Sequence, residues 1–136
     1  MTPRLFTREE VNRLVPQLTR LMERALRDHR AALAVKEALE AEQQRVRLSG
    51  GALVDRRAWQ AQAARLDALS EAVAGALQEI TALGGVVKDL GMGLVDFPGR
   101  VAGEAETVNL CWKYGETAVD WWHGLAEGYA QRKPLP

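Results

Sequence analysis

The chain has 136 residues, which is enough for one domain with a buried core. Its eighteen basic residues balance eighteen acidic ones, so the formal net charge at neutral pH is zero and no overall field attracts nucleic acid or an anionic membrane. Composition therefore argues against nucleic-acid binding and against a membrane partner.

Cys111 is the only cysteine, so no disulfide can form within the chain. The N-terminus has no apolar signal segment, and no run of about 18 apolar residues occurs in the sequence. These features predict a cytoplasmic protein whose thiol stays reduced.

The first predicted element is a long amphipathic helix from Thr7 to about Leu48. Thr7 followed by Glu10 is a capping-box sequence, which is typical of a helix start. Pro16 removes one backbone hydrogen bond, so we expect a kink or a restart there. The apolar residues recur every seven positions, as in coiled-coil packing, at Val11, Leu18, Ala25, Ala32, Leu39 and Val46.

Ser49-Gly50-Gly51 predicts a turn, and a second helix follows from about Asp55 to Leu83. Two helices of similar length joined by a short turn form an antiparallel, coiled-coil-like hairpin. A row of small residues on the second helix lets another helix or a second copy of the chain approach, which predicts a homodimer. Alanine is also a good surface helix former, which is the alternative explanation. The row consists of Ala61, Ala64, Ala68, Ala72 and Gly75.

Glycine and aromatic residues gather after Leu83, and the apolar period changes there. Val86-Val87, the glycine turn at 91–93 and Leu94 to Phe97 predict a β-hairpin, and Thr107 to Trp112 predicts a third strand. Side chains alternate along a strand, so Asn109, Cys111 and Lys113 share one face, and Val108, Leu110 and Trp112 share the other.

A short helix is predicted from Glu116 to about Leu125, with an extended tail from Arg132 to Pro136. The fold class is therefore α+β and mainly α, in a single domain over residues 1–136. A helical hairpin covers 7–83, and a compact module with a small antiparallel sheet and a short helix covers 84–136.

The predicted short helix places Glu116, Asp120 and His123 on one side, because their spacing is i, i+4, i+7. Together with Asp96 or Asp89 from the hairpin, they form a candidate site for zinc, manganese or iron. The structural alternative is a polar surface, or a Glu116–His123 pair that fixes the packing of the neighbouring tryptophans.

Cys111 offers two further alternatives to burial as a small apolar residue. It is a thiolate ligand if it points to the same side of the sheet as Asp96, and it is a nucleophile if His123 acts as its base.

A second group of candidates consists of Lys88, Asp89, Trp112 and Arg132. An open arrangement of these residues forms a pocket for an anion or another small ligand. A closed arrangement forms ion pairs that fix the tail and the hairpin, with the tryptophan in the core.

Five motifs carry a resemblance over nearly the whole chain: Phe6-Thr7-x-x-Glu10, Gly85-Val-x-Lys88-Asp89-x-x-x-Gly93-Leu-Val-Asp96-Phe97-Pro98, Leu110-Cys-Trp-x-x-Gly115-Glu116, Trp122-His123 and Gly128-x-x-x-Arg132. On these motifs the chain resembles the bacterial domain-of-unknown-function family numbered 2203. The resemblance implies that family's fold and a bacterial, cytoplasmic setting, and it implies no reaction. Asp120 lies outside the motif positions, which shifts the metal prediction toward Glu116 and His123 with a hairpin aspartate.

Two functions of different classes follow. The first is a non-enzymatic, oligomeric helical-hairpin scaffold whose C-terminal module binds a protein partner or a small ligand. The second is a metal-binding, enzyme-like and hydrolytic module, with Glu116, His123 and Asp96 as ligands of a divalent ion such as zinc or manganese and Cys111 as a fourth. A third alternative is nucleic-acid binding through the arginines of the first helix, against which the interspersed acidic residues argue.

Overall fold

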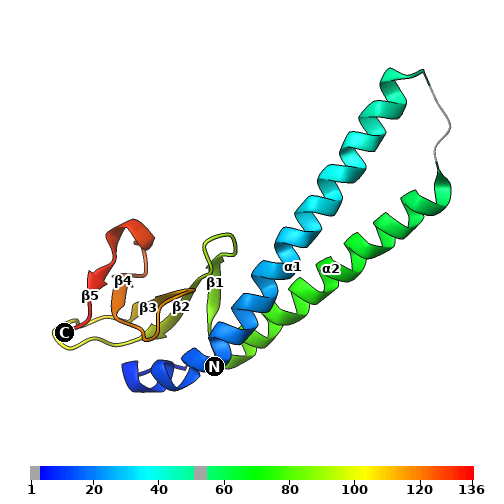
Figure 1. Cartoon of the computed structure of the whole chain (residues 1–136). Helices are drawn as coiled ribbons and strands as arrows, with labels where there is room; N and C mark the ends of the chain where they lie inside the picture. Colours follow the sequence, from blue (N-terminus) through cyan, green and yellow to red (C-terminus); the bar gives the residue numbers. More distant parts are fainter. Residues whose placement is uncertain (1–3, 51–54) are drawn as a thin grey trace.

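The computed structural model describes residues 4–50 and 55–136. Two long helices form a hairpin, and a five-stranded antiparallel sheet lies at one end of it (Figure 1). The elements in chain order are α1 Arg8–Leu48, α2 Arg56–Leu83, β1 Val86–Asp89, β2 Leu94–Gly99, β3 Val108–Lys113, β4 Trp121–Gly124, the 3-10 helix η1 Tyr129–Gln131 and β5 Lys133–Pro134. The predicted α+β class with a helical hairpin is confirmed.

Both helices start where the sequence predicted them. Thr7 caps α1 through a complete capping box with Glu10, and Asp55 caps α2 by accepting a hydrogen bond from a backbone N–H. Ser49 and Gly50 lie in the predicted turn, whereas Gly51 falls outside the described residues.

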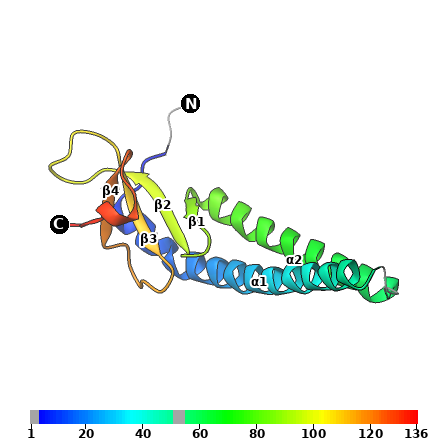
Figure 2. The ribbon, with the colours of Figure 1, turned by 90° about the horizontal axis from the view of Figure 1, so that it is seen from above.

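Pro16 lies inside α1 without ending it. The helix continues through the proline, and Figure 1 shows its first turns (dark blue) running at an angle to the long remainder. The predicted kink is therefore present within one continuous helix. Because of this bend, the first turns of α1 lie along the sheet while the rest of α1 pairs with α2 (Figure 2).

The sheet is a meander, in which each strand pairs with the next strand in the chain, in the order β1-β2-β3-β4-β5. The predicted hairpin and third strand correspond to β1, β2 and β3. The predicted short helix from Glu116 to Leu125 is wrong, because Trp121–Gly124 is strand β4. Strand β4 pairs with β3 and places Trp122 opposite Leu110, so long-range pairing overrides the local helical spacing.

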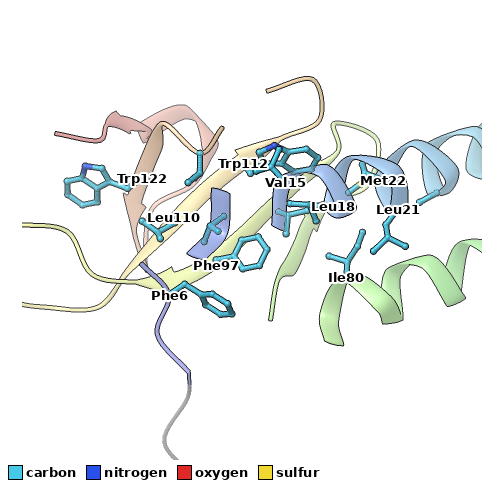
Figure 3. Close-up of a cluster of buried hydrophobic side chains, with 14 of the residues drawn as sticks. Phe6, Val15, Leu18, Leu21, Met22, Ile80, Phe97, Leu110, Trp112 and Trp122 are labelled. Carbon is cyan, nitrogen blue, oxygen red and sulfur yellow. The ribbon is translucent and has the colours of Figure 1, made fainter. Parts of the chain in front are cut away.

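The core lies between one face of the sheet and the bent first half of α1, with the end of α2 beside it. Figure 3 shows Phe97 and Trp112 from the sheet and Leu18 from α1 gathered in this layer. All three side chains are fully buried. Farther along the hairpin the helix seam is only half-buried, and the last buried residue of α1 is Val35.

Phe6, which precedes α1, contacts both the sheet and the end of α2. The Phe6 N–H donates to the Pro98 carbonyl at 2.8 Å, and the Phe6 ring packs edge-on against Phe97 with ring centroids 5.2 Å apart. Gly84 ends α2 in the left-handed conformation with φ +106°, and a Cβ there would lie 2.2 Å from the Phe6 ring. Glycine is therefore required by both the backbone and the packing.

No helix among residues 4–50 and 55–136 is both long enough and apolar enough to cross a bilayer.

Candidate functional site

The face of the sheet that points away from α1 carries polar side chains. Asp96 on β2 is directly opposite Cys111 on β3, and Asn109 on β3 is directly opposite His123 on β4. Residues opposite each other share a face, and so do residues two apart on one strand. These four side chains therefore lie on the same face, which we call the polar face.

Three of these side chains converge. One ligand atom each from Asp96, Cys111 and His123 lies within 4.8 Å of the other two. The residues are 1%, 0% and 2% exposed, respectively. We call this group the buried centre.

The orientation of His123 is fixed by the backbone. Its Nδ1 lies 2.9 Å from the Gly124 carbonyl oxygen, which can only accept a hydrogen bond, so Nδ1 carries a proton. Nε2 is then the ring nitrogen that turns to the buried centre, and in the neutral ring it presents a lone pair. Histidines that bind metals are commonly held in this way, with the second nitrogen donating to a carbonyl.

Both carboxylate oxygens of Asp96 lie close to Nε2 of His123. His123 Nε2 lies 3.2 Å from Oδ1 and 3.1 Å from Oδ2. Oδ2 is fully enclosed and has no hydrogen-bond partner within the described parts of the chain. A carboxylate facing an imidazole lone pair needs a proton or a cation between them, because two electron-rich atoms otherwise repel each other.

The thiol of Cys111 is not set up as a nucleophile. Burial, followed by the nearby charge of Asp96, raises its pKa to about 12, so the thiol is neutral at physiological pH. A catalytic histidine would need one nitrogen for the thiol and the other for an orienting group. Here Nδ1 of His123 is held by a carbonyl and Nε2 by Asp96, so the three groups converge on one point and do not form a relay.

The donors of the buried centre suit zinc. Thiolate and imidazole favour zinc, whereas manganese and magnesium prefer sites made of oxygen atoms. The two ligand atoms in a zinc tetrahedron are separated by about 3.3–3.6 Å, given zinc–ligand distances of about 2.0–2.3 Å. The observed distances of 3.1 and 3.2 Å between Asp96 and His123 are close to that separation. A thiolate and a carboxylate would also balance the charge of a divalent ion.

The segment after β4, residues 125–136, contains the edge strand β5 and reaches the backbone of Cys111 through Arg132, and we call it the strap. Its Arg132 is 9% exposed, and Nη2 contacts both carboxylate oxygens of Glu116 at 2.9 and 2.8 Å and the Cys111 carbonyl at 3.3 Å. The guanidinium group also lies about 5 Å from the ring centroids of Trp121 and Tyr129. These contacts hold the strap on β3 and β4.

Glu116 and Asp120 do not join the buried centre. Glu116 is bound to Arg132 and to the Lys113 N–H, so the predicted Glu116–His123 pair does not form. Asp120 forms an exposed ion pair of 2.8 Å with Arg8. The predicted side-by-side arrangement on a helix fails because these residues lie in the irregular segment between β3 and β4.

The predicted ligand pocket is not assembled from its four residues. Lys88 and Asp89 are exposed on β1, where Asp89 accepts a hydrogen bond from the Met92 N–H in the turn. Trp112 lies in the core on the other face, and its indole N–H donates to the Glu116 carbonyl at 3.0 Å. Arg132 forms an ion pair, as in the closed arrangement that was predicted as the alternative to a ligand pocket.

Two parts of the site were missed at the level of sequence. One is strand β4, which brings His123 beside Cys111, and the other is Asn109, which was placed on the right face without a role. Two neighbouring tryptophans before His123 were the signal for a strand, because aromatic residues favour sheets.

A family model described as "Uncharacterized conserved protein (DUF2203)" matches residues 4–135, which is almost the whole chain. No curated protein and no solved structure matches the chain.

Proposed function

The chain belongs to the DUF2203 family, and from the geometry of its buried centre we propose that it is a metal-binding protein that holds one zinc ion with Asp96, Cys111 and His123. The observation that carries the proposal is the convergence of three different ligand types within 4.8 Å in the protein interior. Burying polar groups in this way is costly without full pairing. A bound divalent ion would satisfy all three groups together.

Two details of the contacts support zinc over a structural network. His123 already presents Nε2 to the centre because its Nδ1–H donates to the Gly124 carbonyl. The enclosed Oδ2 of Asp96 has no hydrogen-bond partner in the described chain, and metal coordination would satisfy it. Zinc would also displace the proton from Cys111, since a thiol that binds a metal is deprotonated.

The test is elemental analysis of untagged protein purified without chelator. We expect about one zinc per chain, retained on dialysis, because structural and catalytic zinc sites bind tightly. His123→Ala and Cys111→Ala, prepared identically, should lose the metal. Glu116→Gln is the matched control and should keep it, since Glu116 binds Arg132 and does not reach the centre. A protein that is empty and also fails to take up zinc on titration would disprove the proposal.

A scaffold role for the hairpin is the second candidate, supported by its distal half. Two cavities of about 400 and 250 Å³ are lined by residues of both helices, and Trp59 borders each of them. The small residues Ala61, Ala64, Ala68 and Ala72 are exposed on α2. Analytical ultracentrifugation of the wild type and of Trp59→Ala would test self-association. A monomer at all concentrations would rule out the homodimer.

A further inference from the structure

The polar face holds a fourth side chain, Asn109, whose position bears on what a metal in the buried centre would do. Asn109 is directly opposite His123 across β3 and β4, and it lies two residues before Cys111 on the same face. It therefore borders two of the three candidate ligands.

Asn109 differs from those ligands in its exposure and in its partners. It is 8% exposed, whereas Asp96, Cys111 and His123 are 1%, 0% and 2% exposed. Within residues 4–50 and 55–136 its side-chain amide makes no hydrogen bond, yet its atoms are not among the fully enclosed atoms that lack a partner. The amide atoms thus keep a small solvent-accessible area beside the centre.

This inference rests on the proposed zinc centre. We propose that the zinc ion binds an exchangeable small ligand, water or a monoanion, on its Asn109 side, and that the Asn109 amide positions that ligand by hydrogen bonding. A zinc ion with three protein ligands keeps its fourth position for water or substrate. An amide offers both donors and acceptors, so it can bind neutral water as well as an anion.

The burial of the centre sets the size of the ligand. Three of the four side chains are at most 2% exposed, and the strap lies beside them. A polymer or a peptide segment cannot reach a metal whose surrounding side chains are this inaccessible, with Asn109 the most exposed of the four at 8%. The ligand class is therefore small molecules of a few atoms, such as water, azide or a short carboxylate.

Cobalt(II) replacing zinc in the full chain provides the test, because its visible d–d bands report coordination and its near-ultraviolet thiolate band reports Cys111. Azide is the probe. We expect azide to shift the visible bands in a saturable way while the thiolate band stays. In Asn109→Leu the thiolate band should remain and azide should bind at least about tenfold more weakly, the effect of losing one hydrogen bond to a charged group. Lys113→Ala, two residues beyond Cys111 on the same strand, is the control and should respond like the wild type.

Each other outcome has one meaning. If the wild type gives no thiolate–cobalt band, the proposed metal centre itself is wrong. If the bands form and azide never shifts them, the centre is closed by four fixed ligands, which overturns this inference and leaves the metal site standing. If Asn109→Leu binds azide as tightly as the wild type does, an exchangeable position exists without a role for Asn109, and the inference is again overturned.

Discussion

Alternate residues of β2 and β3 are buried on opposite faces of one sheet, and the two faces differ in chemistry. Toward α1 the side chains are apolar, as with Phe97 and Trp112. Toward the strap they are Asp96, Cys111 and, from β4, His123. Both sets are almost completely inaccessible to solvent.

The difference separates residues that stabilise the fold from residues for which we propose a metal site. Apolar burial is favourable by itself, at about 25 cal/mol per Å² of buried surface. Burying a carboxylate or an imidazole is unfavourable unless each is paired, so such groups are rarely found inside a protein without a reason. The apolar face thus explains why the chain folds, and the polar face is where the proposed metal site lies.

The largest effect is expected from shortening a side chain on the apolar face. Phe97→Ala should lower the free energy of unfolding by about 3–5 kcal/mol, because it leaves a cavity in the core. Urea unfolding of the metal-free protein measures this effect. The comparison would break if Phe97→Ala cost less than Cys111→Ala, which removes one sulfur atom from the polar face and should cost about 1 kcal/mol.

Zinc should stabilise the protein through the polar face alone. At a free zinc concentration about 100-fold above Kd, the free energy of unfolding should rise by about 2.7 kcal/mol through linkage. The increase should persist in Phe97→Leu, which keeps the core apolar, and vanish in Cys111→Ala. Thermal unfolding with and without zinc gives the result. An equal increase in Cys111→Ala would mean that zinc binds elsewhere.

The ion pair that holds the strap should have an intermediate effect. Glu116→Gln should destabilise the protein by about 2 kcal/mol, because Arg132 is 9% exposed and would lose its charged partner. A double-mutant cycle with Arg132→Met separates the pair from the two side chains alone. A change of less than about 0.5 kcal/mol would mean that this ion pair contributes no more than an ordinary surface ion pair. The strap would then have no measurable role in stability.

The smallest effect is a dependence of stability on alkaline pH. Burial raises the pKa of Cys111 from 9.0 to about 12, so the folded state favours the neutral thiol more than the unfolded state does. This contribution is complete below pH 9 and is lost as the pH rises toward 12. At pH 10, one unit above the unfolded pKa, the loss should be about 1.4 kcal/mol, given about 1.4 kcal/mol per pKa unit. Chemical unfolding of metal-free wild type and Cys111→Ala between pH 8 and pH 10 should reveal it as a steeper decline in the wild type.

The helices and the first three strands were predictable because their signals are local. The capping box at Thr7 and Glu10 and the Asp55 cap depend on residues within one turn, and the alternation around Cys111 depends on one strand. The condition that Cys111 and Asp96 share a side was also stated from sequence, and the structure places them directly opposite each other.

The rest depended on contacts between distant segments. The spacing of Glu116 and His123 suits a helix, whereas Trp121–Gly124 is a strand paired with β3. In the strand, His123 contacts Asp96. Glu116 instead binds Arg132, which lies sixteen residues away in the chain. A single sequence contains no local signal for either pairing.

The meander order has a consequence for how the molecule folds. Each strand of the sheet finds its partner by closing a short loop, and contacts of low sequence separation form quickly. Asp96, Cys111 and His123 lie on three successive strands, so the buried centre can assemble as the hairpins grow. The apolar face has to wait for α1, and the contact of Phe6, just before α1, with Gly99 spans more than ninety residues. We therefore expect the polar half of the sheet to be in place before the core closes over its other side.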